Sequence, residues 1–307
     1  MTDHGRGALG LLLEAYEHYE QRTRGLRPRT LRGYQYLVRQ FVRAVLGEDP
    51  IDISRLNAGD VITFFTSVRG RFRPSTIRTV GTALRSFFRY LLVSGLGDTR
   101  LEAAIPAVAC WKLAHLPRGL SDAQYDRLIA SLGSATLCGR RDRAIVLCLA
   151  TLGLRPGEVA QMCLQDIDWR SGTLQLATRK SRRGAVLPLP RAAGQAIVEY
   201  LQRERPSSRE RQVFLRHSRG RKGEAITAGI VTGAVVRALK RAEIDAPIAG
   251  AYVLRHTVAS RMVRHGTRLK EVADFLGHRD LGTTTIYAKL DLPALRDVAL
   301  PCPEVTR

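Results

Sequence analysis

The sequence is poor in several residue types, and each shortage narrows what the protein can be. Its five cysteines are scattered over 307 residues and include no Cys-x-x-Cys pair. A zinc site or a disulfide framework is therefore not expected, and a reducing cytoplasm is the compartment that fits this cysteine pattern. The acidic residues form no cluster that suits Mg²⁺. We accordingly expect neither a metal site nor a cofactor.

Long apolar runs are also absent. The apolar run near the N-terminus is short and is interrupted by Glu14, so it does not have the form of a signal peptide. No segment approaches the ~20 consecutive apolar residues that a membrane span requires. The sequence contains no internal repeat. We therefore expect a cytoplasmic protein with no membrane partner.

Basic residues dominate the charge. Lys and Arg total 49 against 28 Asp and Glu, which gives a formal net charge of +21. This excess favours a polyanionic partner, nucleic acid first and an anionic membrane surface second. The alternative is an arginine-rich composition whose surface charge has no functional meaning. The hydrophobic fraction of 45% is that of a globular protein, and the length suffices for two modest domains.

The first hundred residues carry four segments with helical periodicity. Apolar side chains recur at helical spacing over Leu9–Tyr19, after Pro28, after Asn57 and after Pro74. Proline at the start of a helix and asparagine as an N-cap both favour these boundaries. We predict that residues 1–98 form a compact helical bundle.

Arginines flank the predicted helix starts and occupy the polar faces of the bundle. Helix N-termini favour anions, so side chains placed there suit contact with phosphate groups. The alternative is a basic face that is merely solvated. The candidates for contact with DNA phosphates are Arg27, Arg29, Arg32, Arg73, Arg78 and Arg85.

Periodicity fades over residues 99–119, which we interpret as an interdomain linker. A second domain over 120–307 begins with Ser121, which has a glutamine three residues later in the capping-box position. Short strand-like segments follow in the region of residues 166–189, and a basic turn between two of them carries Lys180, Arg182 and Arg183. Such a turn is often no more than a solvated surface.

Arg155 lies between two apolar helical segments. A guanidinium in such a place is costly unless it has an anionic partner. Glu158, one helical turn later, lies close enough to be that partner. Arg155 is therefore either a structural ion pair or part of a site for an external anion.

Cations and hydrogen-bond donors recur in three segments of the second domain. Arg155 and Lys180 come first, and Arg255, His278 and Tyr287 follow within one stretch that begins at residue 252. Two arginines suit the oxygens of a phosphodiester, a lysine suits proton donation to a leaving oxygen, and a tyrosine suits covalent attack on phosphorus. In this interpretation the arginines neutralise the charge that a metal ion neutralises elsewhere.

Five segments in order resemble the tyrosine recombinases, or phage-type integrases. They are G-L-R-P-G-E (Gly153 to Glu158), K-S-R-R-G-A-V-L-P-L (Lys180 to Leu189), L-R-H-T (Leu254 to Thr257), L-G-H (Leu276 to His278) and I-Y (Ile286 and Tyr287). Each segment alone is a weak signal, whereas all five in order and at these spacings are a strong one. The bundle also resembles the SAM-like core-binding domain of that family, so the resemblance covers nearly the whole chain.

The resemblance implies a role for each matching residue. Arg155 and Arg255 correspond to the pair of arginines that clamps the scissile phosphate, and His278 corresponds to the histidine that hydrogen-bonds to it. Glu158 matches an acidic residue that supports the first arginine. Tyr287 corresponds to the nucleophile that forms a 3′-phosphotyrosyl bond and frees a 5′-hydroxyl. Lys180 corresponds to the general acid toward the leaving 5′-oxygen, and the ester conserves the bond energy, so no ATP is required.

One position departs from the family pattern. The family usually has histidine three residues before the second arginine, and here that residue is Tyr252. A phenol with an ordinary pKa near ~10 is a weaker base at neutral pH than an imidazole near ~6.5, although it can donate a hydrogen bond to phosphate. The general base is therefore open. His256, which follows Arg255, is interpreted as a buried structural histidine rather than a catalyst.

The sequence thus predicts a mainly α-helical protein whose second domain, the recombinase catalytic domain, contains a small three-stranded antiparallel sheet. The predicted function is site-specific recombination of double-stranded DNA. The resemblance implies a homotetramer on two DNA sites, with the tail at Leu292–Leu300 docking on a neighbour. The alternatives are a relaxing enzyme like the type IB topoisomerases and a DNA-binding regulator with weakened catalysis. The DNA target and the base-reading residues are not predicted.

Overall fold

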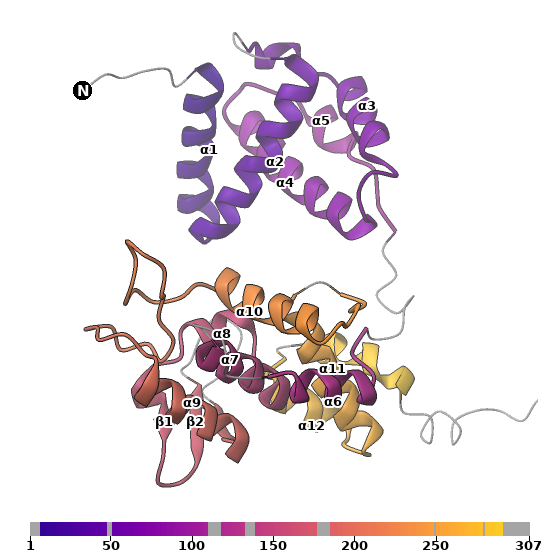
Figure 1. Cartoon of the computed structure of the whole chain (residues 1–307). Helices are drawn as coiled ribbons and strands as arrows, with labels where there is room; N and C mark the ends of the chain where they lie inside the picture. Colours follow the sequence, from indigo (N-terminus) through magenta and orange to yellow (C-terminus); the bar gives the residue numbers. More distant parts are fainter. Residues whose placement is uncertain are drawn as a thin grey trace, which may run out of the picture. The chain divides into compact units, whose positions relative to one another are not determined.

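The computed structural model describes residues 7–47, 51–109, 118–132, 139–176, 185–248, 250–278 and 280–290. The chain divides into two compact units, Met1–Trp111 and Lys112–Arg307. The mainly helical fold expected from the sequence is confirmed in both units (Figure 1). In the described parts of the chain, no helix combines the length and the hydropathy needed to cross a membrane.

The first unit is a helical bundle (Figure 1). Its core is rich in aromatic side chains, and Phe41 meets Phe88 in an edge-to-face contact with ring centroids 5.6 Å apart. Such contacts add to the free energy that burial itself supplies. Its elements are α1 (Ala8–Arg24), α2 (Pro28–Leu46), η1 (Ile53–Arg55), α3 (Ala58–Val68), α4 (Pro74–Val93) and α5 (Thr99–Ala103).

The helix starts follow the signals in the sequence. Pro28 and Pro74 are the first residues of α2 and α4, where the missing N–H costs nothing. Asn57 caps α3 by accepting a hydrogen bond from the N–H of Asp60, and Asp60 accepts one in return from the N–H of Asn57. These predicted boundaries are confirmed.

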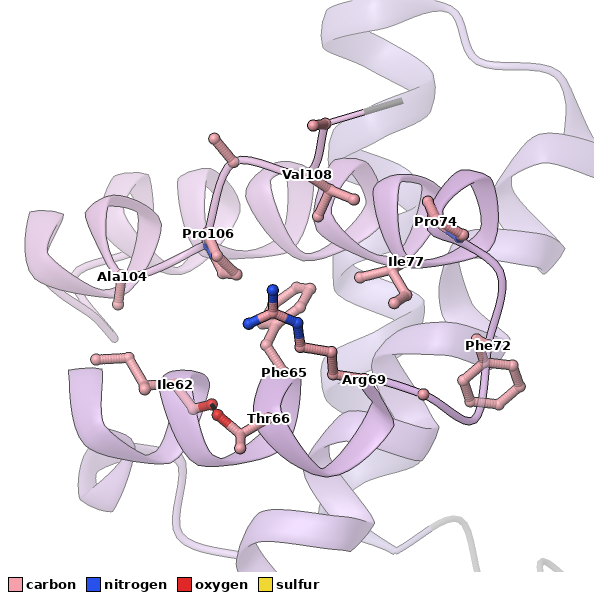
Figure 2. Close-up of a pocket in the computed structure, with 13 residues that line it drawn as sticks. Ile62, Phe65, Thr66, Arg69, Phe72, Pro74, Ile77, Ala104, Pro106 and Val108 are labelled. Carbon is pink, nitrogen blue, oxygen red and sulfur yellow. Dashed lines mark hydrogen bonds between the residues drawn. The ribbon is translucent and has the colours of Figure 1, made fainter. Parts of the chain in front are cut away.

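Helix α5 lies in the first part of the segment 99–119, which was expected to be a linker, and it belongs to the first unit. Leu101 and Ile105 are buried in the core of the bundle. The segment after α5 and helix α3 line a mainly apolar pocket of about 600 Å³, into which the guanidinium of Arg69 extends (Figure 2). Five residues are too few to show helical periodicity, so only tertiary packing identifies this helix.

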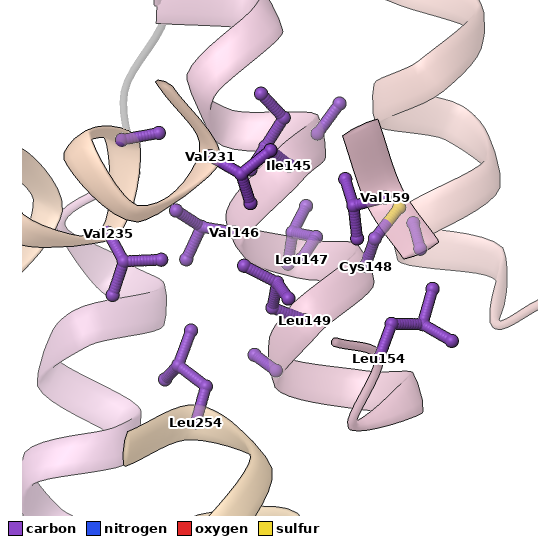
Figure 3. Close-up of a cluster of buried hydrophobic side chains, with 14 of the residues drawn as sticks. Ile145, Val146, Leu147, Cys148, Leu149, Leu154, Val159, Val231, Val235 and Leu254 are labelled. Carbon is purple, nitrogen blue, oxygen red and sulfur yellow. The ribbon is translucent and has the colours of Figure 1, made fainter. Parts of the chain in front are cut away.

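The second unit is organised around helix α7, which is apolar on nearly every face. Val146 and Leu149 of this helix are fully buried, and α10 and α11 pack on it with Val235 and Leu254 among the side chains at the contact (Figure 3). The helices of this unit are α6 (Asp122–Ala130), α7 (Gly139–Leu152), α8 (Pro156–Ala160), η2 (Leu164–Asp166), α9 (Arg191–Arg203), α10 (Ala228–Arg241), α11 (Tyr252–Arg264), α12 (Leu269–Leu276), η3 (Leu281–Thr283) and η4 (Thr285–Leu290).

The predicted three-stranded sheet is confirmed. Strands β1 (Ile167–Asp168), β2 (Thr173–Leu176) and β3 (Ala185–Pro188) pair antiparallel in the order β1-β2-β3. Leu174 lies opposite Ile167 on one side and Leu187 on the other, so one face of the sheet is apolar and buried.

Candidate active site

Arg155 occupies the turn between α7 and α8. It is the N-cap residue of α8, with extended backbone angles that precede Pro156 as the first helical residue. The carboxylate of Glu158 accepts hydrogen bonds from the backbone N–H of Arg155 at 2.8 Å and from Nη1 at 2.9 Å. Glu158 is therefore the ion-pair partner that the sequence suggested. It is not the sole partner, because Nη2 of Arg155 also donates to the carbonyl of Gly277 at 3.1 Å.

Arg255 is a buried arginine on α11, with 5% of its surface exposed. Its Nη1 donates to the carbonyl of Gly153, and its Nη2 donates to the carbonyl of Leu276, both at 2.7 Å. A buried charge is tolerated when its donors are satisfied by polar groups. These two bonds tie α11 to the α7–α8 turn and to the end of α12.

The end of α12 brings the two arginines together. Arg255 and Arg155 donate to consecutive carbonyls, those of Leu276 and Gly277. The last carbonyls of a helix have no partner within the helix and carry its partial negative charge, so they stabilise cations. His278 is the next residue, and the left-handed conformation of Gly277 turns the chain there. Segments far apart in the sequence therefore meet at one point.

Gly153 is required at this junction for two reasons. Its φ is +58°, which side chains other than glycine adopt at a cost. A Cβ atom at this position would lie 2.7 Å from Cδ2 of Leu276 and 3.3 Å from Cγ1 of Val258. The missing side chain lets the turn approach α12 and α11 closely enough for its carbonyl to reach Arg255.

His278 is oriented by a threonine. Its Nδ1 lies 2.7 Å from Oγ1 of Thr284, which is fully buried. A hydrogen bond at Nδ1 fixes the plane of the ring and contributes to setting its tautomer.

Tyr287 lies in η4, and 2% of its surface is exposed. It packs with Val263 of α11 and Leu276 of α12 in a small apolar cluster. Burial raises the pKa of its phenol to about 12, while the charge of Arg255 acts in the opposite direction. The phenol is therefore neutral at physiological pH.

His256 lies against Tyr287. Its Nδ1 is 2.7 Å from Oη of Tyr287, and the two ring centroids are 5.8 Å apart. Burial lowers the pKa of His256, and the positive charge of Arg255 lowers it further. When the neutral imidazole carries its proton on Nε2, Tyr287 donates this hydrogen bond and Nδ1 accepts it.

The other predicted site residues are placed differently. Tyr252 is the first residue of α11 and is 53% exposed, and its hydroxyl makes no hydrogen bond to any residue that the structure describes. Lys180, Arg182 and Arg183 lie outside the described residues, as does the tail at Leu292–Leu300.

The DNA-binding candidates of the first unit lie on its surface. Arg27 and Arg73 are the N-cap residues of α2 and α4, and no side chain caps either helix. Arg85 is half-buried, and the remaining candidates are exposed. These candidates are Arg27, Arg29, Arg32, Arg73, Arg78 and Arg85. None of them makes an ion pair within the described part of the chain.

Sequence reasoning missed two contacts of this site. His256 was interpreted as structural, yet it bonds to Tyr287, and Thr284 was not singled out although it holds His278. The position of His256 directly after Arg255 was the available signal for the first contact. For the second, Thr284 lies in a run of three threonines that gives no indication of which one faces inward.

Tyr287 is buried against His256 and under the charge of Arg255, and Arg155 and Arg255 meet at the end of α12 just before His278. These are the groups that an enzyme needs to break and rejoin DNA strands through a tyrosine. The model of the phage integrase family matches residues 118–292, and that of the phage integrase N-terminal SAM-like domain matches residues 13–95. The chain belongs to the phage integrase family, and it is a tyrosine-type site-specific recombinase that acts on DNA.

Individual relatives agree with this assignment. The chain is 40% identical over 303 residues to the candidate integrase/recombinase y4rA of Sinorhizobium fredii (strain NBRC 101917 / NGR234), which covers 98% of this chain and 73% of the relative. It is 29% identical to the tyrosine recombinase XerD of Listeria monocytogenes serotype 4b (strain F2365), over 94% of this chain and 96% of the relative. In fold it is similar to a lambda integrase tetramer bound to a Holliday junction, with a TM-score of 0.69, 17% identity, and coverage of 93% and 78%.

Proposed function

We propose that Tyr287 is the nucleophile of this recombinase and that it forms a 3′-phosphotyrosyl bond with the cleaved strand. The observation that carries this proposal is the convergence of Arg155, Arg255 and His278 at the end of α12, with the charge of Arg255 acting on the Tyr287 phenol. This arrangement supplies the positive charge and the hydrogen-bond donors that attack on a phosphodiester requires.

The arginines act on the phosphate. Each guanidinium has five N–H donors in a planar fork, and the bonds to Glu158 and to the carbonyls hold that fork in place. As Oη attacks, charge accumulates on the non-bridging oxygens, and donors already in position stabilise it without reorganisation. We assign Arg155 and Arg255 to this clamp and Glu158 to the support of Arg155.

Three further side chains complete the proposed reaction. His278, with Nδ1 held by Thr284, donates from Nε2 to a phosphate oxygen. Tyr252, whose exposed hydroxyl makes no bond to the described residues, donates a hydrogen bond to phosphate. We assign Lys180 as the general acid that protonates the leaving 5′-oxygen. A 5′-hydroxyl of a partner strand then attacks the phosphotyrosine and completes strand exchange.

The first unit is proposed to hold DNA through its backbone. The exposed arginines at the starts of α2 and α4 suit phosphate contacts, because the N-terminal N–H groups of these helices also favour anions. Arg182 and Arg183 are assigned the same role on the turn that carries Lys180. Residues 1–98 are thus proposed as the core-binding domain and 120–307 as the catalytic domain, with α5 added to the former.

We further propose that the protein acts as a homotetramer on two DNA sites and that the tail at Leu292–Leu300 docks on a neighbouring subunit. Support comes from the similar fold of a lambda integrase tetramer bound to a Holliday junction. A Leu295→Glu variant should still form the covalent adduct on an isolated site but should fail to recombine two sites. Normal recombination by this variant would contradict the role of the tail.

The nucleophile can be tested before the target sequence is known. The probe is a pool of nicked DNA duplexes with randomised sequence on both sides of the nick, which traps a covalent adduct because the short cleaved strand diffuses away. The wild type should form adducts, and sequencing of the trapped duplexes yields the preferred site. Tyr287→Phe, which preserves the packing of the ring, should form none. Adduct formation by that variant would overturn the assignment.

A further inference from the structure

Attack by Tyr287 requires that its phenol lose a proton. The pKa of this phenol is raised to about 12 by burial, so phenolate is scarce at neutral pH and a nearby base is needed. Tyr252 is exposed, and its hydroxyl makes no hydrogen bond to any described residue. The proton acceptor must therefore be sought elsewhere.

His256 has the required geometry. Its Nδ1 lies 2.7 Å from Oη of Tyr287, and in the tautomer with the proton on Nε2 it accepts the hydrogen bond of the phenol. The residue lies one helical turn after Tyr252, so the two share one face of α11. The imidazole of His256 is a base that lies within hydrogen-bond distance of the Tyr287 phenol.

The backbone around His256 is held firmly. A Cβ on Gly119 would lie 3.3 Å from the carbonyl carbon of His256 and 3.0 Å from Cα of Thr257. Oγ1 of Thr257 accepts a hydrogen bond from the N–H of Leu120 at 2.8 Å. The chain before α6 thus packs directly on this turn of α11 and fixes the position of the imidazole.

We propose that His256 is a catalytic residue of the cleavage step, the general base that takes the proton from Tyr287; this rests on the proposed function of Tyr287. The O–H bond of the phenol breaks, the proton moves to Nδ1, and Oη forms the bond to phosphorus. The bond from phosphorus to the 5′-oxygen breaks, and that oxygen takes its proton from the general acid, assigned above to Lys180. In rejoining, the imidazolium returns its proton to Oη.

The charges around His256 agree with this role. Among the described residues, Arg255 on α11 is the charged group that acts on the imidazole, and Tyr287 on η4 is the titratable group that faces it. Burial and Arg255 lower the pKa of His256, so the base is unprotonated before DNA binds. A bound phosphodiester opposes the effect of Arg255 and favours the imidazolium as the proton moves.

The test uses the duplex selected from the randomised nicked pool and measures adduct formation in a single turnover over a range of pH. His256→Gln, which preserves a hydrogen-bond acceptor but cannot hold the proton, should slow adduct formation at neutral pH roughly 100-fold or more. The wild-type rate should rise with pH as the imidazole of His256 loses its proton in the complex, and should then level off. The variant should instead continue to rise toward the pKa of Tyr287.

A second substrate separates the base from the acid. Sulfur in place of the 5′-bridging oxygen makes a leaving group whose thiol has a pKa near ~8.5, so it departs without a general acid. Lys180→Ala should regain its rate on this substrate, whereas His256→Gln should not. A melting temperature close to that of the wild type should confirm that His256→Gln is folded.

The outcomes are distinct. No adduct with the wild-type protein on any duplex would refute the proposed function, and the role of His256 with it. Adduct formation by His256→Gln at or above the wild-type rate would overturn the role of His256 and leave that of Tyr287 intact. The hydrogen bond between the two residues would then either restrain the nucleophile or have no effect on catalysis. Recovery of His256→Gln on the sulfur substrate would likewise reject a general base.

Discussion

The arginines of the two units differ in how firmly the protein fixes their side chains. In the second unit, Arg255 is buried and Arg155 half-buried, and backbone carbonyls of distant segments fix both guanidinium groups. In the first unit, Arg27, Arg73 and Arg78 are exposed and form no ion pair with described residues. A buried guanidinium is held in one position, whereas an exposed guanidinium keeps its charge but has no fixed position. The first arrangement suits a transition state, and the second suits the backbone of a duplex.

The largest expected effect is at Arg255. Lysine retains the charge, but a single ammonium group cannot replace a planar guanidinium that reaches the carbonyls of Gly153 and Leu276 together. Arg255→Lys should slow adduct formation by roughly 100- to 1000-fold, the loss typical of one oriented donor in a transition state. Single-turnover cleavage of the selected duplex measures it.

The matched control is Arg78→Lys in the first unit. Its side chain is exposed, so only charge should matter, and the cleavage rate at saturating protein should remain within about twofold of the wild type. If the two lysine variants lost activity equally, the difference between a buried, hydrogen-bonded arginine and an exposed one would have no effect on catalysis.

The next effect tests the close approach that holds Arg255. Gly153→Ala requires a left-handed alanine and a shift of Leu276, whose Cδ2 would lie 2.7 Å from the new Cβ. Strain and overpacking should cost about 1–3 kcal/mol of the free energy of unfolding, measured by urea denaturation. Gly172→Ala is the control, because its φ of +64° is similar but nothing lies within 4 Å of its Cβ position. Equal losses in the two variants would mean that contact with Leu276 is unimportant.

A smaller effect is expected at Thr284. Thr284→Val preserves the shape but removes the hydroxyl that lies 2.7 Å from Nδ1 of His278. Loss of a hydrogen bond of about 1 kcal/mol should slow adduct formation by roughly 5- to 10-fold without changing DNA affinity. Thr284→Ser restores the hydroxyl and should recover most of the rate. Failure of serine to recover it would show that Thr284 acts only by packing.

Most side chains of the proposed site can be named from the sequence alone. Arg155, Arg255, His278 and Tyr287 stand in short segments whose order and spacing are visible without coordinates. The fold class was likewise predictable, because capping residues and apolar periodicity are local signals. These features can be predicted because each depends on residues that lie close together in the sequence.

The connections between those side chains could not be predicted. Arg255 is held by the carbonyls of residues 153 and 276, and a carbonyl is present at every position, so no residue type marks these partners. The bond between His256 and Tyr287 depends on how η4 packs on α11, which joins residues 31 positions apart. Helix α5 was missed for a related reason, since Leu101 and Ile105 are recognised as core only when the bundle is assembled.

The smallest effect concerns a single exposed arginine. If Arg73, at the start of α4, contacts one phosphate, then Arg73→Ala should weaken DNA binding severalfold and reduce the slope of log affinity against log salt by about 0.9. Arg100 is the control: it is also exposed, but it forms an ion pair with Asp98 at 2.7 Å, so Arg100→Ala should leave the slope unchanged. A full salt titration of both variants on one duplex decides the matter. A slope that changes equally in both would mean that the first unit attracts DNA by its total charge. The contrast with the second unit would then be sharper still, because no exposed arginine of the first unit would have a defined phosphate partner.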